Sequence, residues 1–175
     1  MAPSLNPRYH EAGACDWVLF RPVVAHEGVG AGEVQRGDVV TFWKPHQPEE
    51  VGIKRVVGLE GDTVWPKRGY ALEKQEGARL AGMPDGLGDE GDGSIVEKEL
   101  GKVVVPYGHV WVEGDNWRSS LDSNDFGPIS KSLVQEKAVW VWRGWGSVMR
   151  IGDERDGGGS RVVEGKSEIP ELYLE

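Results

Sequence analysis

The lysine at position 54 is the first residue whose surroundings suggest chemistry. It lies in the run Val51-Gly-Ile-Lys-Arg-Val-Val57, which is apolar enough to form a buried or half-buried strand. A lysine held there loses solvation as the ammonium, so its pKa is expected to fall and its free amine becomes available as a general base. The pattern by itself favours the alternative, a side chain that snorkels or lies on the solvent face of the strand. Arg55 points to the opposite face of the strand, so only one of the two is expected to point inward.

A second group of polar residues follows the apolar stretch Val110-Trp-Val-Glu113. It consists of Gly114, Asp115, Asn116, Ser119, Ser120, Asp122, Ser123 and Asn124. So many short polar side chains are typical of a capped turn that satisfies its own backbone. The alternative is that one hydroxyl orients the lysine amine, because a catalytic base needs a further group to hold it. Phe126-Gly-Pro-Ile129 then ends the turn and begins another strand.

Composition excludes several classes of protein. With 29 acidic and 20 basic residues the net charge is −9, which disfavours binding to nucleic acid. Cys15 is the single cysteine, so an intramolecular disulfide is excluded. No cofactor or metal site is expected either, because the histidines show no ligand spacing. These histidines are His10, His26, His46 and His109.

The apolar residues come in short bursts separated by Gly, Pro and Asp, which predicts a mainly β fold. The expected strands lie near 16–21, 38–43, 51–58, 62–65, 102–105, 109–113 and 138–143. In Arg36-Gly-Asp38 and Glu60-Gly-Asp62, a Gly-Asp pair directly precedes a strand. We expect a tight turn there, with positive φ at the glycine and an aspartate that bonds the nearby backbone.

Two segments depart from this pattern. Residues 66–101 contain Gly86-Leu-Gly-Asp-Glu-Gly-Asp-Gly93, which is rich in glycine and acid and cannot bury enough surface to order itself. We expect a flexible acidic insertion there. Residues 152–175 begin with a similar composition and predict a disordered C-terminal tail. The remaining chain, within 1–151, is expected to form one domain.

The lysine segment, the Gly-Asp-Asn box and the opening Met1-Ala-Pro-Ser-Leu-Asn-Pro7 resemble, in order and spacing, the signal peptidase I family of Ser/Lys proteases. Tyr107–Asn116 and Asp122–Pro128 are more similar to the mitochondrial inner membrane peptidase branch. Asn124, where bacterial members and the sister subunit usually carry Arg, makes the chain most similar to the subunit 2 type of that branch. The resemblance implies a signal-peptidase-like β fold.

The resemblance also implies roles for individual residues. Lys54 would be the general base, Ser120 the hydroxyl that orients its amine, and Asp122 a residue that supports the same side of the active site through hydrogen bonds. The nucleophilic serine of the family directly precedes a Met that matches Met1, so it is not present in this chain. Ser4 lies three residues past that Met, where its side chain would be aimed elsewhere, and is not expected to replace it.

By the same resemblance, the function is that of a serine endopeptidase subunit of the mitochondrial inner membrane peptidase complex. Its substrates would be precursor proteins whose sorting signals are removed on the way to the intermembrane space. Its partners would be a sister peptidase subunit and the inner membrane surface, with the catalytic domain facing the intermembrane space. The alternative is a noncatalytic, N-terminally truncated homologue that stabilises a catalytic partner.

The uninterrupted apolar runs are no longer than about five residues, against the roughly 20 needed to cross a bilayer. No secretory signal is visible. The match of Met1 to the Met of the family motif favours a segment upstream that carries the serine and a membrane anchor, with genuine truncation as the alternative.

Trp140 and Trp142 share one face of an expected strand. Core packing is the favoured prediction for them, and a place at the membrane interface is the alternative.

Overall fold

The structure is a computed structural model that describes residues 5, 15–23, 33–66, 101–116, 120–143, 147–151 and 160–167. Strands dominate these residues, and all the strand pairings found among them are antiparallel. The predicted mainly β fold is therefore confirmed. The predicted insertion at 66–101 lies almost wholly outside the described residues.

Within the described ranges, the larger sheet has seven strands. In spatial order they are β1 (Trp17–Pro22), β8 (Val134–Trp142), β2 (Val39–Lys44), β3 (Gln47–Leu59), β6 (His109–Glu113) and β7 (Ile129–Ser130), and β9 (Val148–Arg150) pairs with β8. The smaller sheet contains β10 (Arg161–Val163), β4 (Thr63–Trp65) and β5 (Val103–Val104). A single-turn helix α3 (Ser123–Phe126) and a 3-10 turn η2 (Lys131–Leu133) lie between β6 and β8 in the chain.

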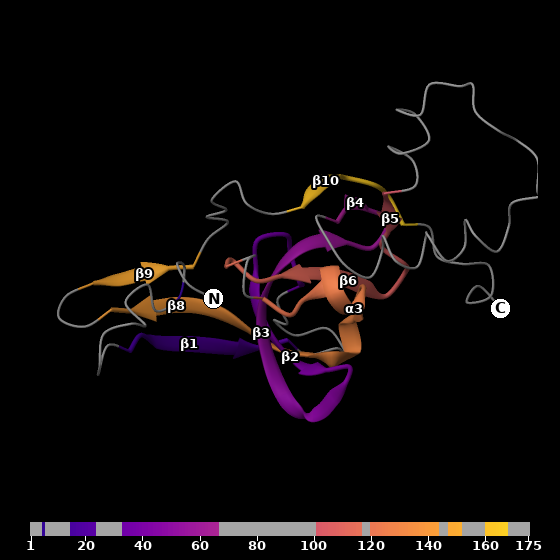
Figure 1. The fold of residues 1–175 in the computed structure, drawn as a ribbon. Coiled ribbons are helices and arrows are strands. Elements are labelled where there is room, and N and C mark those ends of the chain that lie inside the picture. Colours follow the sequence, from indigo (N-terminus) through magenta and orange to yellow (C-terminus); the bar gives the residue numbers. More distant parts are fainter. Residues whose placement is uncertain are drawn as a thin grey trace, which may run out of the picture.

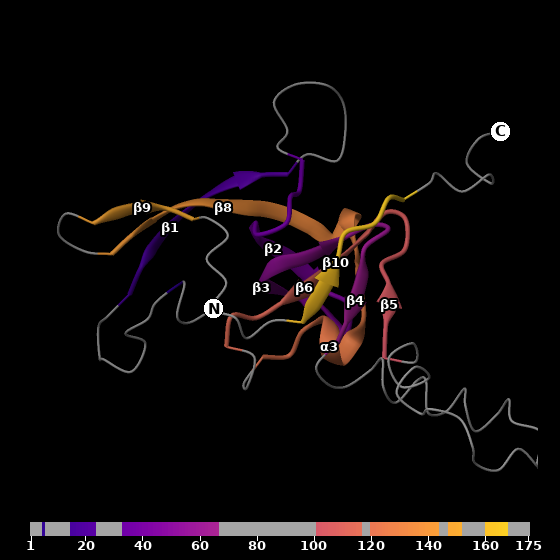
Figure 2. The same ribbon diagram turned by 90° about the horizontal axis from the view of Figure 1, so that it is seen from above.

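The strands β1, β8 and β9 extend away from the rest of the molecule as a wing (Figure 1). The other strands of the large sheet, α3 and the small sheet form the body, and the small sheet lies on the side opposite to the wing (Figure 2). Three apolar clusters hold these parts together. The first, on one face of β2, β3 and β6, includes Val40, Phe42, Val56 and Val112. The second joins the wing to Val39, and the third joins Trp111 of β6 to the small sheet.

Two Gly-Asp turns position the start of β2 and the end of β3 as predicted. Gly37 and Gly61 have φ of 89° and 84°, which a residue with a Cβ adopts only at a cost. Asp62 Oδ2 accepts a hydrogen bond from Leu59 N at 2.8 Å, and Asp38 Oδ2 accepts one from Gln35 N at 2.9 Å. Both aspartates thus bond the backbone three residues back, and this prediction is confirmed.

The expected strand ranges each contain a strand, but β3 and β8 begin earlier than expected, at Gln47 and Val134, and β9 and β10 were not predicted. The prediction of disorder is wrong at 160–167, where β10 pairs with β4 and Ser160 is buried. Composition suggested disorder because the segment supplies little apolar surface. It is held instead by strand pairing and by hydrogen bonds to buried carboxylates of the body.

The favoured core packing of Trp140 and Trp142 is also wrong, since their exposed fractions are 43% and 51%. In the wing, Trp142 lies between Trp17 of β1 and Val148 of β9, and Trp140 lies between Leu19 and Arg150. Cross-strand partners share one face of a sheet. This face of the wing is largely open to solvent, because the side chains on it are exposed as a group.

The docking of the segment that follows β10 can be tested at Gly61. A Cβ there would lie 2.4 Å from Ser167 N, besides requiring φ of +84°. Gly61→Ala is expected to lower the free energy of unfolding by about 2–4 kcal/mol, measured by urea denaturation. Gly108→Ala is the matched control, because its φ is +71° and nothing lies within 4 Å of the added Cβ. Its cost should be only about 1 kcal/mol. Equal losses in the two variants would show that residues 166–167 do not pack on Gly61 in solution.

Candidate functional site

Lys54 lies on the face of β3 that carries the first apolar cluster. It pairs across the sheet with Val40 of β2, and two residues earlier Gly52 pairs with Phe42. Because alternate residues share a face, Val56 lies on the same side of β3 as Lys54. The aliphatic part of Lys54 therefore runs along buried apolar surface, and its amine lies at the edge of the core.

Burial lowers the pKa of the Lys54 amine below its usual range, because the ammonium loses hydration there. The nearby charges act in both directions. Asp122, Asp115 and Asp125 raise the pKa of this amine by attraction, and Lys44 on β2 lowers it by repulsion. Loss of solvation is the largest of these influences, so the net shift is downward. The sequence expectation of a lysine with a lowered pKa is thus met by the structure, against the snorkelling alternative.

Gly114 is the point where Lys54 and Ser120 meet. β3 and β6 pair with Arg55 opposite Glu113, and one step further this register brings Gly114 opposite Lys54. A Cβ built on Gly114 would lie 2.1 Å from Ser120 Oγ and 3.5 Å from Lys54 Nζ. The hydroxyl and the amine therefore share the space that a side chain at position 114 would fill.

Asp122 fixes the backbone of that glycine. Its carboxylate is buried, with Oδ2 accepting from Gly114 N at 3.0 Å and Oδ1 accepting from Asn124 N at 3.1 Å. It is the N-cap of α3 and forms a capping box with Asp125. The predicted capped turn exists, and the carboxylate that caps it also holds the backbone beside Lys54. The capped turn and the support of a lysine site are therefore compatible interpretations of this polar group.

Arg55 departs from the expectation that only one residue of the Lys54–Arg55 pair points inward. It is 1% exposed, and its guanidinium binds Asp115 through Nε–Oδ1 at 2.9 Å and Nη2–Oδ2 at 3.1 Å. Nη1 donates to the carbonyl of Gly37 at 2.7 Å. Both faces of β3 are covered by other parts of the molecule at this point. The alternation of side chains along the strand therefore does not leave one of the two residues exposed. The aspartate that follows Gly114 was the usable signal for this ion pair.

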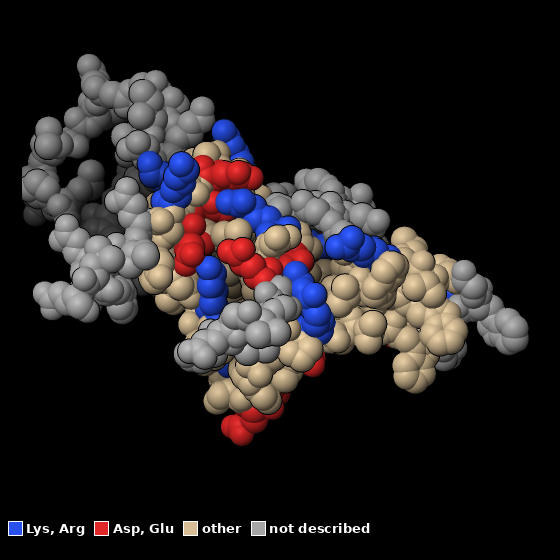
Figure 3. Space-filling model, turned by 180° about the vertical axis from the view of Figure 1, so that it is seen from behind, with Lys and Arg blue, Asp and Glu red and all other residues tan. Residues whose placement is uncertain are grey.

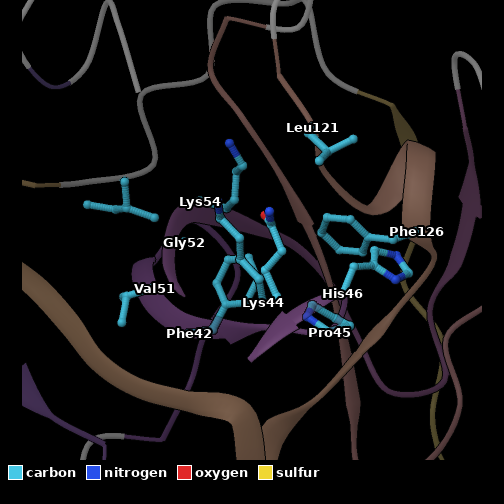
Figure 4. A pocket seen from close by; sticks show the side chains of 11 residues that line it. Phe42, Lys44, Pro45, His46, Val51, Gly52, Lys54, Leu121 and Phe126 are labelled. Atoms are coloured by element: carbon cyan, nitrogen blue, oxygen red, sulfur yellow. The ribbon is translucent and has the colours of Figure 1, made fainter. Parts of the chain in front are cut away.

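A cavity of about 260 Å³ lies beside Lys54. Figure 4 shows His46 and Phe126 next to each other on one side of it and Val51 on the other, and the rings of His46 and Phe126 meet edge to face with centroids 5.9 Å apart. Its lining is mainly apolar, and Lys44 and Lys54 contribute amines. The complete lining is Phe42, Lys44, Pro45, His46, Gln47, Val51, Gly52, Ile53, Lys54, Leu121 and Phe126. The sequence did not predict this cavity, because its walls come from β2, β3 and the α3 region.

Several sequence candidates fall outside the described residues: Met1, Ser4, His10, His26 and Ser119. Within the described part of the chain, no group of three or more His, Cys, Asp or Glu side chains could hold a metal ion. The helices found there include none of the length and apolarity that a membrane span requires.

Comparison with known proteins shows a clear family relationship. The family described as Signal peptidase, peptidase S26, matches residues 15–145, and the chain belongs to it. Its similar relatives include mitochondrial inner membrane protease subunit 2 of Saccharomyces cerevisiae, with 36% identity over 89% of this chain and 72% of that protein. The predicted resemblance to the mitochondrial branch of the family is confirmed.

Two further relatives agree. Subunit 2 of Mus musculus is 38% identical over 81% of this chain and 61% of that protein. Mitochondrial ATP-independent inner membrane protease subunit 1a of Arabidopsis thaliana is 38% identical over 80% of this chain and 66% of that protein. The chain thus spans between about three fifths and three quarters of the length of these three relatives. A solved signal peptidase I of Enterococcus faecalis overlaps 59% of this chain and 94% of that chain with a TM-score of 0.36 and 23% identity, too weakly to define the arrangement of the strands.

The lowered pKa of Lys54 makes a prediction about stability. Below the folded-state pKa the amine is charged in both states, and burying that charge costs free energy. The cost decreases as the pH rises above the lowered folded-state pKa, and it is gone above the ordinary pKa of lysine, where the unfolded state has also lost its proton. Lys54→Met is therefore expected to raise the Tm near neutral pH, and the gain should shrink at alkaline pH. Lys131→Met, which removes a partly exposed ion pair with Glu60, should show no gain. A Tm for Lys54→Met below that of the parent near neutral pH would contradict the desolvated site.

Proposed function

We propose that this chain carries the peptidase domain of a serine endopeptidase subunit of the mitochondrial inner membrane type, with Lys54 as the general base. The observation that carries the proposal is the convergence of a desolvated lysine amine and a buried serine hydroxyl on Gly114. A lysine acts as a base only when its amine is neutral, and burial favours the neutral amine by lowering the pKa of Lys54. The family membership of the chain supports the same reaction class.

In this mechanism Lys54 Nζ takes the proton from the hydroxyl of the nucleophilic serine, which the resemblance places directly before Met1. The serine oxygen then attacks the scissile carbonyl carbon, and the amine of the departing peptide takes the proton from Lys54 as the C–N bond breaks. In the second half a water molecule gives a proton to the same lysine and attacks the acyl carbon, and the ester bond to the serine breaks as the serine oxygen takes that proton from Lys54. The amine thus accepts and releases one proton in each half of the reaction and returns to its neutral state.

Ser120 and Asp122 serve this base without reacting themselves. Ser120 Oγ and Lys54 Nζ both lie beside the Cα of Gly114. The hydroxyl there limits the directions in which the amine can point. Asp122 holds Gly114 N, so that the backbone between the two side chains stays fixed. A catalytic group held within a narrow range of positions loses less entropy on reaching the transition state.

The substrates on this proposal are precursor proteins with cleavable sorting signals. The substrate backbone would lie in extended form along the site, with small side chains before the cleavage point. The mainly apolar cavity beside Lys54 supplies space for a substrate side chain on the lysine side of the site. A sister peptidase subunit is the proposed protein partner, since relatives are named as numbered subunits.

We also assign the open face of the wing to the inner membrane surface. Its exposed side chains are Trp17, Leu19, Trp140, Trp142 and Val148, which lie side by side across β1, β8 and β9. Indole rings favour the headgroup region of a bilayer, and Arg150 next to Trp140 suits lipid phosphate. Figure 3 shows charged side chains of both signs over the body, while the wing is mostly uncharged in that view. The wing would hold the catalytic domain against the membrane on the intermembrane-space side.

The catalytic role of Lys54 is tested by replacing it in the organism's own gene. Lys54→Met keeps the length and the apolar part of the side chain and removes the amine, so uncleaved precursor should accumulate and product formation should fall by at least about a hundredfold. Precursor and mature forms are resolved by gel electrophoresis and immunoblotting. Lys131→Met is the control and should process normally. Normal processing by Lys54→Met would reject the proposal and favour a noncatalytic subunit that stabilises a catalytic partner.

Membrane contact is tested with phosphatidylcholine vesicles and the purified chain. Replacing both Trp140 and Trp142 by Ser should weaken cosedimentation with the vesicles on the order of tenfold, because two partly exposed indoles no longer enter the interface. Trp43→Ser is the control, because Trp43 is a partly exposed indole on β2 outside the wing. Equal binding by the wing variant and the parent would remove the assignment.

A further inference from the structure

A buried hydrogen-bond network connects the C-terminal segment to the wall of the Lys54 site. Glu113 Oε1 accepts from Asn124 Nδ2 at 3.1 Å, and Asp122 Oδ1 accepts from the same nitrogen at 2.9 Å. Ser160 Oγ donates to Asn124 Oδ1 at 3.3 Å, and Ser160 N donates to Glu113 Oε2 at 3.0 Å. All four residues are at most 6% exposed.

The amide of Asn124 has one favourable orientation in this network. Both of its donors face carboxylate oxygens, so a flipped amide would place its oxygen against two negative charges. The two carboxylates set this orientation, and the Ser160 hydroxyl adds a hydrogen bond to the amide oxygen. Ser160 thus helps to hold in place the amide that bridges Asp122 and Glu113.

Asp122 connects Ser160 and Asn124 to the Lys54 site. Its Oδ1 is held by Asn124, and its Oδ2 holds Gly114 N, the backbone on which Ser120 and Lys54 converge. We propose that Ser160 is a positioning residue of this peptidase, which holds the Asn124 amide, the Asp122 carboxylate and the Gly114 backbone in the arrangement that the Lys54 base requires. This inference rests on the proposed function of Lys54.

Several other interactions hold the segment that bears Ser160 against the body. The segment therefore does not need the Ser160 hydroxyl to keep its position. β10 pairs with β4 over three residues, and the Arg161 guanidinium lies 5.1 Å from the centre of the Trp65 ring. Gly165 N donates to Asp62 Oδ1 at 3.0 Å. Ser160→Ala also keeps the backbone hydrogen bond to Glu113. This variant is therefore expected to fold and to lose one hydrogen bond within the network.

The groups that set the charge around Lys54 are Lys44 on β2, Asp115 after β6, and Asp122 and Asp125 at the start of α3. Loosening Asp122 would weaken its attraction for the ammonium and would also admit water to the amine. Loss of solvation dominates the present shift, so admitting water should have the larger effect and move the pKa of Lys54 upward, toward its ordinary range.

The test compares Ser160→Ala with Glu164→Ala in the complete peptidase. Glu164 lies on the same segment, but its exposed side chain pairs with Arg36, away from the network. Ser160→Ala should lower kcat by about three- to tenfold, the equivalent of one hydrogen bond, with KM within about twofold of the parent. The acid limb of its pH–rate profile should move to higher pH. Glu164→Ala should leave kcat and the profile unchanged, and Ser160→Thr, which keeps a hydroxyl, should restore part of kcat.

Two measurements separate this role from general stabilisation. NMR titration of the Lys54 side chain should show a higher pKa in Ser160→Ala than in Glu164→Ala, whether or not either variant is active. In a double-mutant cycle, Ser160→Ala should have little further effect on kcat once Asn124 is replaced by Ala. The inference is wrong if Ser160→Ala matches Glu164→Ala in kcat and in the pKa of Lys54, or if Ser160→Ala lowers only the Tm. If Lys54→Met retains activity, the proposed function fails instead.

Discussion

The arrangement of the site depends on one hydrogen bond, from Gly114 N to the buried carboxylate of Asp122. This bond fixes the backbone just after β6, where the register with β3 has brought Gly114 opposite Lys54. Because Gly114 has no side chain, Ser120 Oγ and Lys54 Nζ can both occupy the space beside it. Asp122 can do this because it is also the N-cap of α3, so the start of a single-turn helix serves as an anchor for the strand end next to it.

The two basic residues of β3 at the site are buried in different ways. Arg55 is fully buried, and a bidentate ion pair with Asp115 compensates its charge. Lys54, on the other face of the same strand, lies near three aspartates, yet loss of hydration still outweighs their attraction and keeps its pKa low. One strand thus carries a cation that must stay charged and an amine that can be neutral. The difference follows from direct pairing in the first case and burial at the edge of an apolar cluster in the second.

The local features of the fold were predictable because they depend on neighbouring residues. The Gly-Asp turns at Gly37 and Gly61 follow from φ preferences and short side-chain reach, and the structure has both. Predictions that depended on distant parts of the chain were less accurate. Trp140 and Trp142 have the composition of a core strand, but they lie on the open face of the wing. Segment 160–167 has the composition of a tail, but β4 and the carboxylates of Glu113 and Asp62 hold it in place.

The sequence by itself determined the β character of the chain, the two turns, and the candidate residues Lys54, Ser120 and Asp122, because residue type and short-range spacing carry that information. The tertiary structure alone decided that Lys54 is desolvated, that Ser120 meets it at Gly114, and that Asp122 is tied through Asn124 to Glu113 and Ser160. Each of these relationships joins segments that are far apart in the chain. They arise from strand register and from packing between the two sheets. A local pattern of residues predicts neither of these.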